Sequence, residues 1–297
     1  MGVGEEVSST RRPRRLAHRA SRATVGKIAG AGYTPRVLPT PCWIVSDTHL
    51  GASPPEVERD LLGFLRAARV QAKSVVINGD LFDFWFEWRT VMPRHGFRVI
   101  AAIADLVDAG LPVVWMAGNH DAWGDQMLRN EIGVDFRFEA WRGAIGGWQA
   151  HIEHGDGLRE VEDRGYRRVR RVLRARWAIS ALRLLHPDLA TRLALGSSAG
   201  SRHRSGAPDG AGLERVALAM LDRERTTTLV SFGHTHVRRL LRAPAGGVYA
   251  NSGGWERGAA FVRVLDDEVE LREWRGSGDG DRLDVLERLP EKARRLP

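Results

Sequence analysis

Short apolar runs alternate with helical patterns through the first half of the chain. Residues 42–46, 74–78 and 111–117 are apolar runs bounded by polar residues, a pattern typical of buried strands. Between them, residues 55–70 and 97–109 place their apolar side chains at helical spacing. This order of strand, helix, strand, helix and strand predicts βαβ units and a largely parallel sheet.

The second half of the chain is dominated by closely spaced strand patterns. Asp266 and Asp267 separate the last two of these patterns, so we expect a hairpin at that point. The sheet is therefore expected to gain antiparallel members. The expected strands are residues 148–154, 227–232, 247–252, 259–265 and 268–274.

A helical stretch interrupts these strands at about residues 158–205. Its apolar residues, among them Val169, Val172 and Trp177, recur at roughly helical spacing, and Pro187 is expected to restart the helix. Because the stretch is rich in arginine and poor in acidic residues, we interpret it as an inserted cap.

The domain organisation follows from these patterns and from the ends of the chain. Residues 1–38 carry clustered arginines without a hydrophobic period, which indicates a basic, flexible extension. Residues 39–275 are expected to form the main domain, and residues 276–297 a polar, peripheral C-terminal tail. With 43% hydrophobic residues, a sizeable core is expected in the main domain.

Charge and cysteine content narrow the class of protein. The net charge is +8, and Lys27, Lys73 and Lys292 are the only lysines, so the surplus is almost entirely arginine. This surplus favours an anionic partner, namely nucleic acid, acidic lipid headgroups or a phosphorylated substrate, unless it reflects genome composition. The single cysteine, Cys42, excludes a disulfide framework and favours a cytoplasmic location. We find no secretory signal and no apolar stretch long enough to span a membrane.

Five blocks of polar residues each follow one of the predicted strands. In an open α/β sheet, ligands bind beyond the carboxyl ends of the strands, so we expect the five blocks to converge. In D-x-H and H-x-H, alternate residues would point to the same side of an extended chain, and the glycines would allow sharp turns and close approach. The blocks are Asp47-Thr48-His49, Gly79-Asp80-Leu81-Phe82-Asp83, Gly118-Asn119-His120-Asp121, His154-Gly155-Asp156 and Gly233-His234-Thr235-His236.

The chemistry of these side chains indicates a metal centre. Carboxylate, imidazole and amide groups without a thiolate suit Mn²⁺, Fe or Zn²⁺ better than Ca²⁺ or Cu⁺. The seven candidate ligand side chains are too many for one catalytic ion that keeps an open coordination position. We therefore expect two divalent ions about 4 Å apart that share one carboxylate.

In this order the blocks DTH, GDLFD, GNHD, HGD and GHTH resemble the signature of the calcineurin-like metallophosphoesterases, with the match running from about residue 43 to residue 275. The resemblance implies a four-layer αββα sandwich with mixed sheets. It also implies that Asp80 bridges two ions. The ligands implied for the first ion are Asp47, His49 and His236, and those for the second are Asn119, His154 and His234.

The same resemblance implies a reaction. A metal-bridging hydroxide would attack phosphorus in line, because coordination can lower the pKa of water to about 7. His120 would donate a proton or hydrogen bond to the phosphoryl or leaving oxygen, oriented by Asp83. Asp121 and Asp156 would be supporting groups that orient the ligands.

Within this family, the segments GDLFDFW, GNHDAW and HGDGL followed by EDRGY and an arginine-rich insert resemble the UDP-2,3-diacylglucosamine diphosphatase branch of lipid A synthesis. The branch implies Mn²⁺, a lipid-linked nucleotide substrate cleaved to UMP and a lipid monophosphate, and an insert that forms a lid over the acyl chains. It favours a peripheral position of the protein on the inner face of the membrane. The alternative interpretation of the insert is an ordinary amphipathic helical hairpin packed on its own domain. Part of the branch has arginine where this chain has His120. The candidate substrate-binding residues are Asp163, Tyr166, Ser198, Ser201 and Arg202.

Two other functions remain open. The pI of about 10.5 is compatible with a nuclease or nucleotide phosphodiesterase of the same superfamily, although nucleic acid is not the favoured partner. A non-catalytic interaction module on a degenerate fold is the less favoured alternative, because such a module should have lost metal ligands, and every expected ligand is present.

Overall fold

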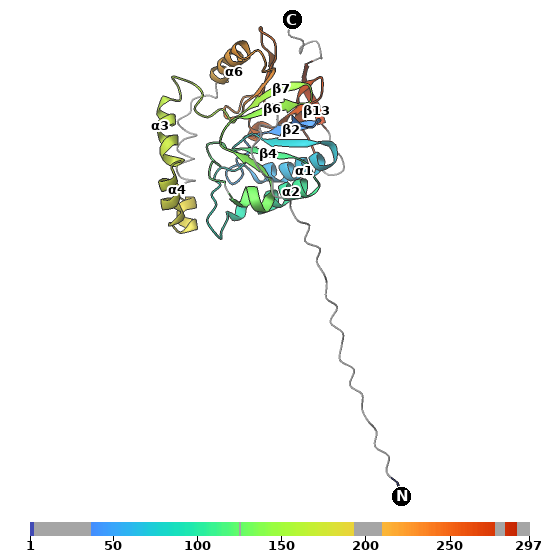
Figure 1. Cartoon of the computed structure of the whole chain (residues 1–297), viewed down its shortest axis with the longest axis vertical. Coiled ribbons are helices and arrows are strands. Elements are labelled where there is room, and N and C mark those ends of the chain that lie inside the picture. Colours follow the sequence, from blue (N-terminus) through green and yellow to red (C-terminus); the bar gives the residue numbers. More distant parts are fainter. Residues whose placement is uncertain (3–36, 125, 193–209, 277–282, 290–297) are drawn as a thin grey trace, which may run out of the picture. The chain divides into compact units, whose positions relative to one another are not determined.

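The computed structural model describes residues 1–2, 37–124, 126–192, 210–276 and 283–289 (Figure 1). The chain divides into two units, Met1–Thr34 and Pro35–Pro297, and the fold and site below lie in the second unit. The predicted N-terminal extension, residues 1–38, falls almost wholly outside the described residues.

One sheet has seven strands in the order β13-β12-β11-β2-β3-β4-β5. The strands β2 to β5 run parallel to one another, as the alternating pattern predicted. β11 joins β2 in the antiparallel direction, and β11 and β12 form the expected hairpin, which closes with a hydrogen bond from Leu265 N–H to Glu268 O. The strands are β2 (Cys42–Val45), β3 (Ser74–Ile77), β4 (Val113–Met116), β5 (Asp135–Arg137), β11 (Ala259–Val264), β12 (Val269–Trp274) and β13 (Leu283–Leu289).

The second sheet has six strands in the order β1-β6-β7-β8-β10-β9. It is also mixed, because β7, β8 and β10 are parallel, whereas β6 pairs with β7 and β9 with β10 in the antiparallel direction. Its strands are β1 (Val37–Leu38), β6 (Trp141–Ile145), β7 (Trp148–Ile152), β8 (Leu229–Ser231), β9 (Arg239–Arg242) and β10 (Val248–Asn251).

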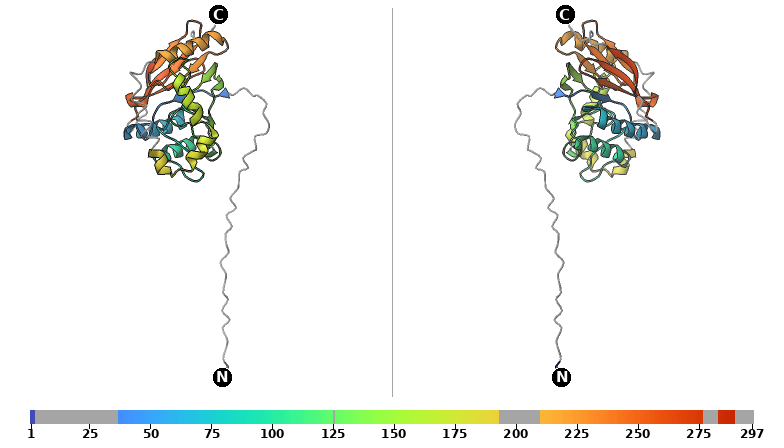
Figure 2. Two further views of the ribbon diagram at one scale, coloured as in Figure 1. Left: turned by 90° about the vertical axis from the view of Figure 1, so that its left-hand side faces the viewer. Right: turned by 90° about the vertical axis from the view of Figure 1, so that its right-hand side faces the viewer.

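The two sheets pack face to face between layers of helix. Side chains such as Ile44 of the first sheet and Trp148 of the second share a buried cluster between the sheets. On the outer face of the seven-stranded sheet, the helices α1 (Pro55–Gln71) and α2 (Phe97–Asp108) bury a second cluster. The helix α6 (Ala211–Arg223) covers the other sheet. The layers are therefore helix, sheet, sheet and helix, which is the expected αββα sandwich (Figures 1 and 2).

The strand β2 shows why the sequence predicted buried strands so clearly. Trp43 and Val45 face the cluster under α1 and α2, while Cys42 and Ile44 face the other sheet. Because both faces of the strand are buried, all four residues are apolar and no polar alternation is left.

The insert carries helices that stand beside this body (Figure 1). The helices α3 (Arg164–Leu173) and α4 (Arg176–Arg183) follow each other, and residues 187–192 are helical again, so Pro187 restarts the helix as predicted. α3 buries none of its residues. Among the described helices, none combines the length and the apolar character that crossing a membrane requires.

Several elements were not predicted. The strands β1, β5, β6 and β9 contain no long apolar run, so their sequences do not stand out as buried strands. The segment after residue 275 contains the edge strand β13, which pairs with β12 although the composition predicted only a polar tail. A π-helix at Met127–Ile132 and the helix α6 were also missed.

Candidate active site

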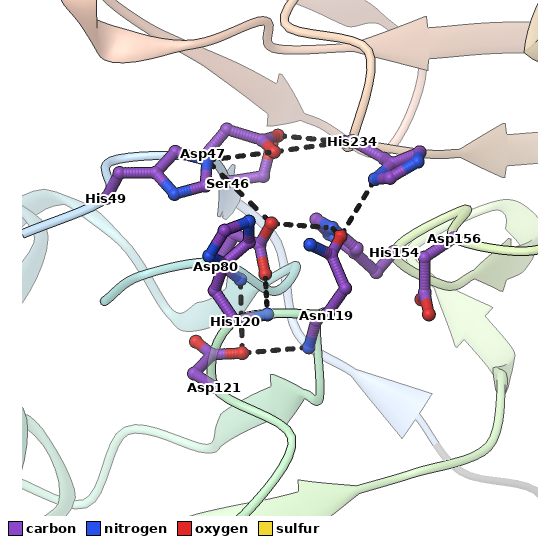
Figure 3. A network of polar contacts seen from close by, with 12 residues as sticks. Ser46, Asp47, His49, Asp80, Asn119, His120, Asp121, His154, Asp156 and His234 are labelled. Carbon is purple, nitrogen blue, oxygen red and sulfur yellow. Dashed lines mark hydrogen bonds and ion pairs between the residues drawn. The ribbon is translucent and has the colours of Figure 1, made fainter. Parts of the chain in front are cut away.

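The five polar blocks leave the strands at the joint edge of the two sheets. Asp47 follows β2, Asp80 follows β3 and Asn119 follows β4 in one sheet, while His154 follows β7 and His234 follows β8 in the other. These strands run parallel within each sheet, so their carboxyl ends bring the blocks to one place (Figure 3). The sequence predicted this convergence but not that two sheets share it.

The residues expected around a first ion form one cluster. Asp47, His49 and His236 can each offer a ligand atom, and these atoms lie within 4.8 Å of one another. The Nε2 atom of His236 lies 3.6 Å from Oδ1 of Asp47 and 3.1 Å from Nε2 of His49.

The residues expected around a second ion form a neighbouring cluster. Ligand atoms of Asp80, His154 and His234 also lie within 4.8 Å of one another. The amide oxygen of Asn119 faces the same space, 2.9 Å from Nδ1 of His234 and 3.2 Å from Nε2 of His154.

Asp80 lies between these clusters. Its Oδ2 atom is 3.1 Å from Nε2 of His154 and 3.8 Å from Nε2 of His49. Burial alone would raise the pKa of Asp80, but the nearby rings of His154, His120 and His49 lower that pKa well below its usual value. Asp80 is therefore a carboxylate at neutral pH, placed where one oxygen can face two cations.

The orientation of the histidine rings fits divalent cations. Nδ1 of His154 donates to the carbonyl oxygen of Asn78 at 2.8 Å, and Nδ1 of His236 donates to the carboxylate of Glu256 at 3.0 Å. With the proton held on this outer nitrogen, the lone pair of the inner Nε2 points into the site. The Nε2 atoms of His49 and His236 face each other at 3.1 Å. If neither nitrogen carries a proton, the two lone pairs cannot form a hydrogen bond with each other. A cation between them would accept both lone pairs.

The backbone at these residues is strained. Within the part of the chain that the structure describes, the non-glycine residues with positive φ are all candidate ligands, and their φ values run from 45° to 67°. Such conformations cost about 1–3 kcal/mol each and concentrate at functional sites. The residues are Asp47, His49, Asp80, His234 and His236.

This geometry corrects one expectation. We expected Asp47-Thr48-His49 and His234-Thr235-His236 to be extended, with alternate side chains on one side. Instead both ends of each motif are left-handed, so tight turns rather than a strand bring the paired side chains into the site. The turn at Asp47 is held by hydrogen bonds from Asp47 N–H to Gly79 O and from His49 N–H to Asp80 O.

Two glycines allow the loops to approach one another, as the motifs predicted. A Cβ atom on Gly118 would lie 2.1 Å from Oδ1 of Asp80, and one on Gly233 would lie 2.6 Å from Oδ2 of Asp47. Any larger residue at either position would therefore displace a candidate ligand.

Asp121 fastens two of the loops together. Its buried carboxylate accepts hydrogen bonds from the backbone N–H groups of Asp80, Leu81 and Gly118 and from the indole of Trp115. Burial and the neighbouring Asp80 raise the pKa of Asp121 to about 6. Asp121 therefore holds the loops of Asp80 and Gly118 together, and it is not a member of the candidate metal clusters among the described residues.

His120 and Asp83 lie beside the first cluster. The Nδ1 atom of His120 is 3.0 Å from the backbone oxygen of Asp83 and 3.5 Å from its carboxylate. The carboxylate lies equally far, 3.5 Å, from Nδ1 of His49. The expected pair is thus in contact, but the closer partner of His120 is the carbonyl, and the carboxylate faces two histidines.

The candidate substrate residues of the insert fall into two groups. The carboxylate of Asp163 is buried and accepts hydrogen bonds from the backbone and guanidinium of Arg159. The hydroxyl of Tyr166 donates to Asp156 at 2.8 Å. Ser198, Ser201 and Arg202 lie outside the described residues, so the structure places only Asp163 and Tyr166, at the base of the insert.

Asp156 connects the insert with the loops of the site. Besides Tyr166, its carboxylate contacts the guanidinium groups of Arg170 and Arg174 of the α3 region, each at 3.4 Å. Arg174 also donates to the carbonyl oxygen of Gly118 at 2.9 Å, directly before Asn119. The position of α3 is therefore tied to the loop that carries a candidate ligand.

Carboxylate, imidazole and amide donors that meet on strained loops at the edge of an αββα sandwich are the arrangement of a metal-dependent phosphoesterase. A family model described as calcineurin-like phosphoesterase matches residues 40–238. The chain belongs to this calcineurin-like phosphoesterase family, whose members are metal-dependent hydrolases.

Individual relatives point in the same direction. A UDP-2,3-diacylglucosamine hydrolase of Porphyromonas gingivalis is 36% identical over 168 residues, which cover 55% of this chain and 64% of that protein. The match thus spans less than two thirds of that relative. A UDP-2,3-diacylglucosamine hydrolase of Klebsiella pneumoniae subsp. pneumoniae is 30% identical over 235 residues, 76% of this chain and 96% of the relative. Among solved structures, vacuolar protein sorting 29 from Cryptosporidium parvum aligns at 14% identity with a TM-score of 0.43, over 84% of this chain and 97% of its own.

Proposed function

We propose that the protein is a two-metal hydrolase that cleaves the diphosphate bond of a UDP-linked, diacylated sugar and releases UMP and a lipid monophosphate. The observation that carries the proposal is the position of Asp80, whose single oxygen Oδ2 faces His49 of one cluster and His154 of the other. The relatives named UDP-2,3-diacylglucosamine hydrolase support the choice of substrate.

In this proposal each cluster holds one ion and Asp80 contacts both. Mn²⁺ is the favoured ion, with Fe or Zn²⁺ as alternatives, because the ligands are oxygen and imidazole donors without thiolate. When bound, the ions would supply Lewis-acid activation of water and neutralise charge on the phosphoryl oxygens. The first ion would be held by Asp47, His49 and His236, and the second by Asn119, His154 and His234.

His120 is the proposed proton donor. Its Nδ1 atom donates to the backbone oxygen of Asp83, and in this proposal Nε2 is the atom that faces a leaving oxygen. Its ring stands edge-on to the ring of His49 at 4.8 Å between centroids, and its ligand atom lies within 4.8 Å of those of His49 and Asp80. The ring therefore borders both clusters, and in this proposal it acts on the leaving oxygen. The Asp83 carboxylate lies 3.5 Å from the same Nδ1 atom, so Asp83 borders the ring through both its backbone and its side chain.

The insert supports a lipid-linked, anionic substrate. It exposes apolar side chains among its arginines, including Val169, Trp177 and Leu184, of which Leu184 is 88% exposed. A surface with both apolar and cationic side chains suits acyl chains and an anionic membrane face. We therefore propose a peripheral position on the inner, cytoplasmic face of a membrane.

A cavity beneath the insert adds to this support. It has a volume of about 620 Å³, within the usual range for ligand sites, and opens between α4 and the segment that follows the second motif. That segment is connected to the site, because Trp85 N–H donates to the carbonyl oxygen of His120. The cavity is lined by Trp88, Arg89, Thr90, Val91, Ser180, Arg183, Leu184, Leu185 and Pro187.

A substrate panel with added Mn²⁺ tests the proposal. It compares UDP-2,3-diacylglucosamine, bis-p-nitrophenyl phosphate, a cyclic nucleotide and single-stranded DNA, with Asp80→Ala and His120→Ala as inactive references. We expect the acylated UDP-sugar to have the highest kcat/KM. A higher kcat/KM for DNA or the cyclic nucleotide would favour the nuclease or phosphodiesterase instead, and undiminished turnover by Asp80→Ala would overturn the two-metal mechanism.

A further inference from the structure

A short turn after β10 touches the first cluster from outside. The turn is the 3₁₀ helix η3 (Trp255–Arg257), and its middle residue, Glu256, accepts a hydrogen bond from Nδ1 of His236 at 3.0 Å. The other ring nitrogen of His236, Nε2, then faces Asp47 at 3.6 Å. Glu256 therefore determines which nitrogen of His236 is free to bind a cation.

The backbone of this turn is anchored through Trp255. Trp255 is 3% exposed, its backbone N–H donates to the carbonyl oxygen of Asp47 and its indole donates to Ala260 O. The turn therefore contacts two candidate ligands, Asp47 through its backbone and His236 through the side chain of Glu256.

Gly254 makes room for this contact. A Cβ atom there would lie 2.2 Å from Oε2 of Glu256 and 2.7 Å from Nδ1 of His236. A side chain at position 254 would thus occupy the space in which the carboxylate and the ring meet.

His236 is more exposed than two of the other candidate ligands. Its side chain is 25% exposed, whereas those of His49 and His154 are 7% and 1% exposed and are held by the surrounding protein. A ring at the rim can rotate or exchange tautomers unless a second group orients it, and carboxylates in this role typically change metal affinity 10- to 100-fold.

We propose that Glu256 is a positioning residue that orients His236 and thereby sets the affinity of the first metal site. This inference depends on the proposed two-metal centre. Neither the five motifs nor their spacing includes Glu256, which lies twenty residues beyond His236 in the chain.

The experiment measures binding of Mn²⁺ alone to the metal-free full chain, by the electron paramagnetic resonance signal of free Mn²⁺. The variants are Glu256→Ala and Glu256→Gln. The matched control is Glu153→Gln, which alters a similar carboxylate–histidine contact, that of Glu153 with His151 at 2.7 Å, outside the two clusters. Thermal unfolding of each metal-free protein is recorded alongside.

We expect Glu256→Ala to bind one of two Mn²⁺ ions about 10- to 100-fold more weakly. Glu256→Gln should lose less affinity, because its amide oxygen still accepts the hydrogen bond, and Glu153→Gln should bind like the wild type. The melting temperature of metal-free Glu256→Ala should be unchanged, and saturating Mn²⁺ should restore its turnover.

Three results would contradict the inference in different ways. If the wild type binds two ions and Glu256→Ala binds both with wild-type affinity, the role of Glu256 is wrong while the two-metal centre stands. If the wild type binds fewer than two ions, the proposed function fails as well. A lowered melting temperature of metal-free Glu256→Ala with unchanged Mn²⁺ affinity would assign Glu256 a merely structural role.

Discussion

The Oδ2 atom of Asp80 lies 3.1 Å from Nε2 of His154, although the two residues come from different sheets. Both side chains are almost fully buried. Asp80 follows β3 of one sheet and His154 follows β7 of the other, so the contact forms only when the two sheets pack together. It connects the two candidate metal clusters.

Replacing Asp80 should therefore disable both halves together. We expect Asp80→Asn to lower kcat by at least about 100- to 1000-fold, because it removes a charge that faces two ions. The measured metal content should also fall. Asp222→Asn, the same change at an exposed residue of α6, is the control and should keep full activity and metal content.

Loss of His120 should affect catalysis and not metal binding. As a proton donor it should contribute about 100- to 10,000-fold to kcat. We expect His120→Gln to lose activity mainly on substrates with poor leaving groups and far less on p-nitrophenyl esters, with unchanged Mn²⁺ affinity. His186→Gln, at a largely exposed histidine, should behave like the wild type. Equal losses on both kinds of substrate would argue against proton donation.

Gly118 is expected to tolerate no side chain. In Gly118→Ala the new Cβ would meet Oδ1 of Asp80 at 2.1 Å and force this carboxylate or the loop to move. Both the affinity for Mn²⁺ and kcat should fall strongly. Gly165→Ala is the matched control, because a Cβ there meets nothing within 4 Å, and within α3 it should stabilise the helix by about 1 kcal/mol. Calorimetric titration with Mn²⁺ and thermal unfolding measure the two effects.

The Asp163–Arg159 contact should make stability depend on pH. Burial would raise the pKa of Asp163, but its hydrogen bonds with Arg159 and the charge of Arg159 lower that pKa below its usual value. A carboxyl group whose pKa is lower in the folded state stabilises the fold at pH values above its unfolded-state pKa. This stabilisation is lost as the pH falls through the folded-state pKa. Asp163→Asn should therefore cost on the order of 1 kcal/mol at pH 7 and progressively less as the pH falls below the unfolded pKa. Urea unfolding of both proteins across pH 2–7 measures the difference, and a constant difference would contradict this account.

Arg174 should hold the insert against the site. It donates to Gly118 O and contacts Asp156, so Arg174→Ala removes hydrogen bonds that involve charged groups. We expect hydrogen exchange in α3 to show an opening free energy lower by about 1–3 kcal/mol. KM should rise for the acylated substrate but not for bis-p-nitrophenyl phosphate. Arg168→Ala, at an exposed position of the same helix, should leave the exchange rates unchanged.

Local sequence pattern was enough to predict the class of fold and to group the candidate site residues. Buried strands such as β2 and amphipathic helices such as α2 carry local periodicity, which a single chain displays without its partners. The motif residues stand directly after such strands, and parallel strand ends must meet at one edge, so Asp47, Asp80 and Asn119 could be grouped in advance.

How those residues face one another could not be predicted, because it depends on the folded domain. The left-handed backbone of Asp47 and His234, the two histidines around Asp83 and the contact of Glu256 with His236 depend on residues far apart in the chain. The edge strands β1 and β9 likewise owe their pairing to neighbours and not to their own few residues. Local pattern records which side chains are buried, but contacts across two sheets are selected by the packing of the whole domain, and no single segment of sequence carries that information.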